Sequence, residues 1–231
     1  MVEGGIAKFD FDIDYFKGGK GSSYKNYHKV GRRVYELTLA ELKRFIKSEN
    51  INPREFSILV VGCAYGYECK ASSDLGFKRV VGVDISEHAV SEAKKTFPEI
   101  EFYVRDACNL EFEDKEFDII LANNILEHLP DPRVALKEFH RVAKRYVIVR
   151  LDNVFAIELF NSLPIGLRKI IGKLTGLPIE LDTDLTHISQ LPRYKWIQLF
   201  RSYQFNVKQI FSISKFPVIF AGFHHYILEV K

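Results

Sequence analysis

A buried strand followed by a glycine-containing turn constrains the fold of this chain more than any other feature. Residues 58–61 are four consecutive branched apolar residues, which is typical of a strand covered on both faces in a parallel sheet. Gly62 and Gly66 follow at once, and residues 67–71 can begin a helix. This arrangement presents backbone N–H groups at the carboxyl edge of a sheet, where open α/β folds bind their ligands.

An acidic residue at the end of the next strand extends this pattern. Residues 79–84 are a second, largely apolar strand, and Asp84 lies 22 residues after Gly62. Dinucleotide folds place a carboxylate about 20 residues beyond the glycine turn, where one carboxylate accepts both ribose hydroxyls. The alternative is that Asp84 only caps the following helix, together with Ser86. The spacing favours the ribose role and therefore predicts a nucleoside site.

Strands and helices alternate as far as residue 151. The predicted elements after the glycine turn are strands at 101–105, 117–122 and 145–150 and helices at 68–75, 87–97 and 131–142, and a helix at 31–48 precedes the turn. After a helix at 193–203, two late strands at 206–214 and 225–230 have no helix between them and predict an antiparallel hairpin. The expected fold is α/β, a doubly wound, mostly parallel seven-stranded Rossmann-like sheet with an antiparallel edge strand.

The chain length and two atypical segments predict the domain organisation. The 231 residues, 47% of them apolar, fit a single domain. Residues 1–30 mix aromatic and basic side chains; we expect a lid over the sheet edge, although such a mixture can also contact nucleic acid. Residues 152–191 are too long for a plain loop and too short for an independent domain, and they predict a helical insertion after the fifth strand.

Composition and charge argue against several classes of protein. The net charge of +3 is too small to imply a nucleic-acid partner by itself. No apolar run reaches the ~18 residues needed to span a bilayer, and the start carries no recognisable signal peptide. Three cysteines, an odd number, favour a reduced, cytoplasmic protein. The cysteines have no zinc-like spacing with histidine, so no metal is expected.

Four runs, in order, resemble the class I S-adenosylmethionine (SAM)-dependent methyltransferases. Residues 59–66 resemble the glycine-rich first motif, 81–86 the strand with the ribose-binding acid, 105–107 the pair that holds the adenine, and 117–129 the fourth strand and its turn. The run Leu126-Glu127-His128-Leu129 resembles the branch that modifies small molecules, which includes quinone-biosynthesis methyltransferases. The run Thr186-His187-Ile188 also resembles that branch.

The resemblance implies SAM as methyl donor, S-adenosylhomocysteine as product, and a set of binding residues. Asp84 would accept the ribose hydroxyls, and Asp106 would accept the adenine amine. Asn123 would line the place where the methyl group meets its acceptor. The implied cofactor-binding residues are Gly62, Cys63, Ala64, Gly66, Asp84, Ile85, Asp106, Ala107 and Asn123. Two departures stand out, because Val60 replaces the family's usual acid and Ala64 its third glycine.

The implied enzyme transfers a methyl group by in-line displacement to a small or amphipathic acceptor. A base is needed only if the acceptor must lose a proton, and His128 and His187 are the candidate catalytic residues; each could instead be structural. Glu127 is expected to be structural, bonding to backbone near the first motif. A nicotinamide dehydrogenase would need glycine where Ala64 and Tyr67 stand. A non-catalytic SAM-binding or interaction protein and an RNA or protein methyltransferase remain as alternatives.

Overall fold

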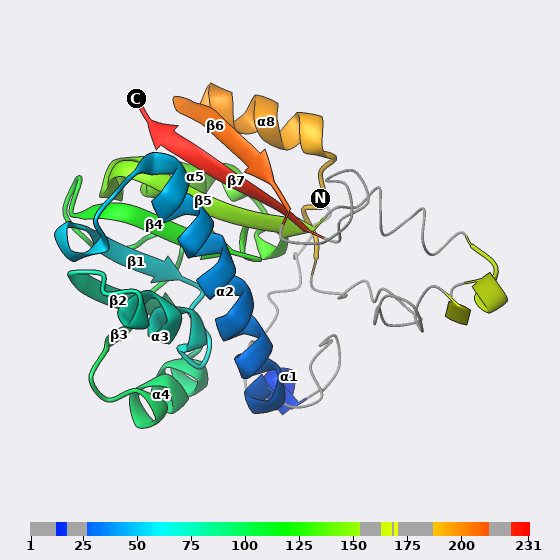
Figure 1. Ribbon diagram of the computed structural model, residues 1–231, viewed down its shortest axis with the longest axis horizontal. Coiled ribbons are helices and arrows are strands. Elements are labelled where there is room, and N and C mark those ends of the chain that lie inside the picture. Colours follow the sequence, from blue (N-terminus) through cyan, green and yellow to red (C-terminus); the bar gives the residue numbers. More distant parts are fainter. Residues whose placement is uncertain (1–12, 18–26, 153–162, 168, 171–186, 213–222) are drawn as a thin grey trace, which may run out of the picture.

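The computed structural model describes residues 13–17, 27–152, 163–167, 169–170, 187–212 and 223–231 (Figure 1). A central sheet is covered by helices on both faces. Most of the predicted insertion at 152–191 and much of the predicted lid at 1–30 lie outside the described residues. No helix in the described part of the chain combines the length and the apolar character that crossing a membrane requires.

The sheet has seven strands in the order β3-β2-β1-β4-β5-β7-β6. The strands are β1 (Ser57–Val61), β2 (Arg79–Asp84), β3 (Glu101–Val104), β4 (Phe117–Asn123), β5 (Ala143–Asp152), β6 (Phe205–Phe211) and β7 (Phe223–Val230). Strands β1 to β5 pair in parallel, whereas β7 pairs antiparallel with both β5 and β6. The predicted doubly wound α/β sheet is confirmed. The reversed strand, β7, lies one place inside the edge strand β6.

The helices divide between the two faces of the sheet. Helices α2 (Tyr27–Glu49), α3 (Tyr67–Asp74) and α4 (Glu87–Thr96) cover one face, and α5 (Pro132–Val142) and α8 (Arg193–Ser202) cover the other. A short helix, α1 (Ile13–Lys17), and two 3₁₀ turns, η1 (Pro53–Glu55) and η2 (Leu126–His128), also lie in the described part of the chain. Residues 165–167 and 169–170, within the predicted insertion, are helical as well. Figure 1 shows α2 crossing its face of the sheet and α8 lying beside β6 and β7.

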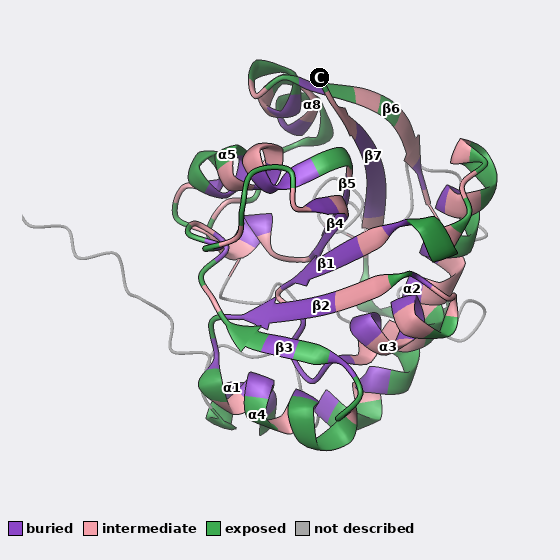
Figure 2. Cartoon of the chain, turned by 90° about the vertical axis from the view of Figure 1, so that its left-hand side faces the viewer, coloured by how far each residue is buried: buried purple, intermediate pink, exposed green. Residues whose placement is uncertain are grey.

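Strand β1 is apolar at every position after the first because it is covered on both faces. Leu59 and Val61 belong to the core under α5 and α8, while Ile58 and Val60 belong to the core under α2, α3 and α4. Figure 2 shows β1 and β7 buried along most of their length. Val60 is fully buried on the α2 side, so the position of the family's usual acid holds an apolar core residue.

Helix α2 begins at Tyr27, four residues before the predicted start, and its buried face includes polar side chains. Thr38 and Glu41 are fully buried beside Leu42 and Phe45. At Gly31 the helix passes so close to α3 that a Cβ atom would lie 2.1 Å from a ring carbon of Tyr67. Close contact between α2 and α3 therefore carries the polar side chains of α2 to the carboxyl edge of the sheet.

Candidate functional site

The glycine turn after β1 is fixed to the neighbouring strand by its backbone. The N–H groups of Gly62 and Cys63 both donate to the carbonyl of Val83, at 2.8 and 2.9 Å. Gly62 has a φ of +71°, and a Cβ atom there would lie 1.8 Å from Cδ1 of Ile125. Only glycine combines this conformation with this close approach. Ala64 adopts a φ of +45° and is tolerated in the left-handed region as a non-glycine residue.

Asp84, the predicted ribose-binding residue, lies directly against this turn. Its Oδ2 atom accepts the N–H of Ala64 at 2.8 Å, and its Oδ1 atom accepts the N–H of Ser86 at 2.9 Å. The hydroxyl of Ser86 accepts the N–H of Ala89 and caps α4, so the capping role belongs to Ser86. Burial raises the pKa of Asp84, and the backbone donors partly offset this effect. The result is a nearly buried carboxylate held at the carboxyl edge.

Asp106 and Ala107, predicted to hold the adenine, follow β3, and Ile85, another predicted cofactor-binding residue, follows β2. Ile85 is 46% exposed, although it is a large apolar residue. Because β2 and β3 pair in parallel with Asp84 opposite Val104, Ile85 and Asp106 follow neighbouring strands. Asp106 accepts the N–H of Cys108 at 2.8 Å and stays exposed, while Ala107 is buried. An exposed apolar side chain beside an acid suits an aromatic ring that carries an amine.

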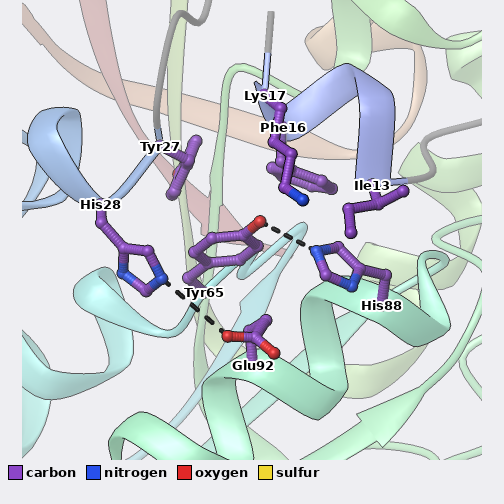
Figure 3. Close-up of a pocket in the computed structure, with 8 residues that line it drawn as sticks. All are labelled: Ile13, Phe16, Lys17, Tyr27, His28, Tyr65, His88 and Glu92. Atoms are coloured by element: carbon purple, nitrogen blue, oxygen red, sulfur yellow. Dashed lines mark hydrogen bonds and ion pairs between the residues drawn. The ribbon is translucent and has the colours of Figure 1, made fainter.

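An aromatic cluster braces the outer side of the glycine turn. Phe16 of α1 and Tyr27 of α2 pack on Tyr65, with ring centroids 4.9 and 5.0 Å from the Tyr65 ring. The hydroxyl of Tyr65 lies 3.0 Å from Nε2 of His88 in α4 (Figure 3). A pocket of about 220 Å³ lies among these side chains, His28 and Glu92. Two residues of the predicted lid, Phe16 and Tyr27, thus contact the glycine turn. Closure of a lid over the site stays a prediction.

A buried network of charged and amide side chains lies at the ends of β4, β5 and β7. Its members are Glu41 of α2, Glu68 of α3, Asn123 of β4, Arg150 of β5 and His225 of β7. Asn123 donates to Glu41 at 2.8 Å and to Glu68 at 3.0 Å, and Arg150 donates to Glu68 at 2.9 Å. Nδ1 of His225 lies 2.6 Å from the Glu41 carboxylate. Only Asn123 of this polar network was predicted from the sequence.

Burial and the neighbouring charges shift the pKa values of the two glutamates of the network in opposite directions. Burial opposes ionisation of Glu41, but the nearby His225 and Arg150 outweigh it, so its pKa is lowered. At Glu68 burial dominates and raises the pKa. Two buried atoms of the network have no hydrogen-bond partner within the described ranges: Oδ1 of Asn123, and Nη1 of Arg150, which lies 3.6 Å from Oε2 of Glu41. Buried polar atoms are rarely left in this state, so both atoms mark places for a polar ligand.

The two predicted catalytic histidines meet in space. The rings of His128 and His187 have centroids 4.6 Å apart, although the residues are 59 positions apart in the chain. His128 ends η2, and the segment after His187 is attached to η2 because the N–H groups of Ile188 and Ser189 both donate to the carbonyl of Glu127 at 2.9 Å. Asp152, at the end of β5, has Oδ2 3.1 Å from Nδ1 of His187.

Glu127 lies beside this histidine pair, and its hydrogen-bond partner is not the predicted one. Its Oε1 atom accepts a hydrogen bond from Nδ2 of Asn124 at 3.0 Å. Asn124 directly follows β4, so this partner is a side chain and not the backbone of the glycine motif. Burial raises the pKa of Glu127 to about 8, and the charge of Asp152 adds to the effect. The sequence could have indicated this site through the adjacent Glu127 and His128, but their contact with His187 depends on the fold.

Comparison with known proteins shows what the central part of the chain is similar to. Residues 59–149 match a family model described as a methyltransferase domain. This match and the relatives below support the resemblance to the class I SAM-dependent methyltransferases. The matched residues include the glycine turn, Asp84, Asp106, Asn123 and His128, so the resemblance inferred from the sequence motifs is confirmed for the part that carries the nucleoside site.

The curated relatives of this segment include two methyltransferases with quinone-type substrates in their names. Demethylmenaquinone methyltransferase of Chlorobaculum tepidum is 32% identical over 151 residues, which cover 61% of this chain and 61% of the relative. The 2-methyl-6-phytyl-1,4-hydroquinone methyltransferase of Synechocystis is 36% identical over 96 residues, 40% of this chain and 30% of the relative. The chain therefore spans less than two thirds of the length of these relatives.

A solved structure supports the fold over a longer stretch. Magnesium protoporphyrin IX methyltransferase from Synechocystis, solved with bound S-adenosylhomocysteine, superposes with a TM-score of 0.61 at 17% identity. The match covers 89% of this chain and 88% of that protein. At this identity the likeness shows the shared methyltransferase fold.

Proposed function

We propose that this protein is a SAM-dependent methyltransferase that acts on a small or amphipathic acceptor. The observation that carries the proposal is the Asp84 carboxylate held 2.8 Å from the Ala64 N–H of the glycine turn. This contact joins the two parts of a nucleoside site, the turn with its bare backbone and the acid for the ribose hydroxyls. The pairing is what the domain family needs at the carboxyl edge of β1 and β2.

The residues present fit SAM along its whole length. The turn from Gly62 to Gly66 would pass beneath the methionine part, and Asp84 would hold the ribose. Ile85, Asp106 and Ala107 would receive the adenine. Oδ1 of Asn123 and Nη1 of Arg150 have no hydrogen-bond partner among the described residues, although Nη1 lies 3.6 Å from Glu41, and they offer an acceptor and a donor for the ammonium and carboxylate of the methionine end. These two side chains would take over the contact that Val60 cannot make.

When bound, SAM supplies a methyl group on a sulfonium that needs no further activation. The protein therefore has to align the acceptor and exclude water. The aromatic cluster of Phe16, Tyr27 and Tyr65 supports the turn for this purpose. A hydroxyl acceptor must also lose its proton, and we propose His128 and His187 as the residues that assist this proton transfer.

The acceptor class follows from the relatives. Both named relatives carry quinone or hydroquinone substrates in their names, which supports a quinone-type ring with an apolar tail for this chain. The net charge of +3 gives no support to a nucleic-acid acceptor. A cytoplasmic location is part of the same proposal and follows from the odd number of cysteines.

Transfer of a labelled methyl group tests the proposed activity. The full chain is incubated with SAM labelled in its methyl group and with fractions of a lipid extract that contains demethylated quinones. We expect label in an apolar fraction, and loss of that label with Asp84→Ala. A protein that binds SAM but labels no fraction would be a binding module, and label in protein or RNA alone would contradict the small-molecule acceptor.

A further inference from the structure

Three side chains at the acceptor end of the site have the composition of a metal centre. Glu127, His128 and His187 each offer one ligand atom, and these atoms all lie within 4.8 Å of one another. We propose that Glu127, His128 and His187 bind a divalent transition-metal ion. The site stands on its own geometry, whereas a role for the ion in methyl transfer rests on the proposed function.

The carboxylate of Glu127 is the strongest evidence for a cation. Glu127 is 2% exposed, and its Oε1 atom is held by Nδ2 of Asn124 at 3.0 Å. The amide of Asn124 is fixed in this orientation because its Oδ1 accepts Nε of Arg150 at 2.9 Å. The other oxygen, Oε2, is buried and has no hydrogen-bond partner among the residues that the structure describes. A buried carboxylate oxygen in this state is costly unless a proton or a cation meets it.

The cluster is held together before any ion arrives. Two backbone N–H groups, from Ile188 and Ser189, donate to the Glu127 carbonyl at 2.9 Å, and the Ser189 hydroxyl donates to the carbonyl of Leu129 at 2.6 Å. These bonds attach the segment that carries His187 to the turn that carries the other two residues. Because the ligand atoms are already close, binding requires only a small contraction, and little ordering entropy opposes it.

A second carboxylate lies at ion-pair distance from His187. Oδ2 of Asp152 lies 3.1 Å from Nδ1 of His187. A carboxylate beside a ligating imidazole fixes the ring and increases its basicity. Asp152 ends β5, a central strand of the sheet, so this support is rigid.

The donor set selects the class of metal. Two imidazoles and one carboxylate are the ligands of catalytic zinc sites that keep a further position open, and they also suit iron, cobalt and manganese. An open position would accept an oxygen of the acceptor and lower the pKa of that hydroxyl. The histidines would then promote loss of the acceptor's proton indirectly, by holding the ion. The sequence predicted no metal because the cysteines lack zinc-like spacing, whereas these ligands are brought together by the fold.

Titration with Co²⁺ alone, without SAM, tests the site on the full chain after removal of metals with a chelator. We expect binding of one equivalent, with visible absorption bands of nitrogen and oxygen ligation and without thiolate charge-transfer bands. Glu127→Gln and His187→Ala should each weaken binding about tenfold or more. His28→Ala is the matched control, because this half-exposed histidine of α2 belongs to the aromatic pocket, and its variant should bind Co²⁺ as the wild type does.

Several results would overturn the proposal. These are no binding by the wild type, equal binding by Glu127→Gln, or thiolate bands that assign the ion to Cys63 and Cys69. Glu127→Gln keeps the shape of the side chain and removes the carboxylate ligand, so it decides the question even if His187→Ala fails to fold. Calorimetry with S-adenosylhomocysteine on the metal-free protein is a separate test, because loss of that binding would refute the proposed function and leave the metal site standing.

Discussion

Two regions of the carboxyl edge present polar groups in different ways. At the ends of β1 and β2, backbone N–H groups of a glycine turn meet a single carboxylate, Asp84. At the ends of β4, β5 and β7, polar side chains meet each other in a buried network that includes Glu41, Glu68 and Arg150. The first region uses residues of one short stretch and the strand beside it. The second is assembled from five separate elements.

This difference explains why one region is recognisable in the sequence and the other is not. A turn that depends on backbone conformation needs glycine at fixed positions, and the acid follows at a spacing set by one strand–helix–strand unit. A side-chain network needs only that several elements bring compatible groups together. Glu41 and His225 are 184 positions apart, and neither has a neighbour in sequence that marks it. The following predictions test whether the two regions differ in energetics as well.

The largest effect is expected from removing the cation of the network. Arg150→Leu would leave Glu68 buried without its positive partner and Glu41 with His225 alone, and it should lower the free energy of unfolding by about 3–5 kcal/mol. Urea unfolding measures this change. Arg32→Ala is the control, because Arg32 pairs with Glu36 on the exposed face of α2 and should have little effect. Equal losses in the two variants would show that the network does not stabilise the fold.

The next effect tests the turn. Gly62→Ala should destabilise the protein by about 2–4 kcal/mol, because the new Cβ would be strained at a φ of +71° and would collide with Ile125. Gly76→Ala is a matched control with a φ of +83° but with its nearest atom, Cγ of Arg54, 4.0 Å away. That variant should lose only about 1–2 kcal/mol, from strain alone. A similar loss at both glycines in thermal or urea unfolding would argue against the close approach at Gly62.

A pH dependence should come from a buried histidine beside the network. Burial lowers the pKa of His224 to about 4, and the charge of Arg193 adds to this. Between pH 6.5 and 4, His224 binds a proton in the unfolded chain but stays neutral in the folded protein. The free energy of unfolding therefore falls as the pH falls. The loss should reach about 2–3 kcal/mol near pH 4 and be absent in His224→Gln. Parallel curves of unfolding free energy against pH for the two proteins would contradict this assignment.

The sequence predicted the strands and helices better than the site, and α3, α4, α5 and α8 lie within one residue of their predicted bounds. Strands such as β1 and β2 are continuous apolar runs between turn residues, and their positions came out within one residue. The start of α2 was placed too late because Tyr27 and His28 carry no capping signal. Val60 was seen to replace an acid, but the sequence could not show that Asn123 and Arg150 keep buried polar atoms near that strand end. The contact of His128 with His187 depends equally on tertiary structure.

The central claim is that the glycine turn and Asp84 hold the nucleoside of SAM. Titration calorimetry with S-adenosylhomocysteine tests it on the wild type, on Asp84→Ala and on Asp114→Ala, which removes an exposed surface carboxylate. The account predicts binding by the wild type and the Asp114 variant, and affinity weaker by about 1–3 kcal/mol with Asp84→Ala, because the ribose hydroxyls lose their acceptor. Unchanged affinity in Asp84→Ala, or binding of NAD instead of S-adenosylhomocysteine by the wild type, would contradict it.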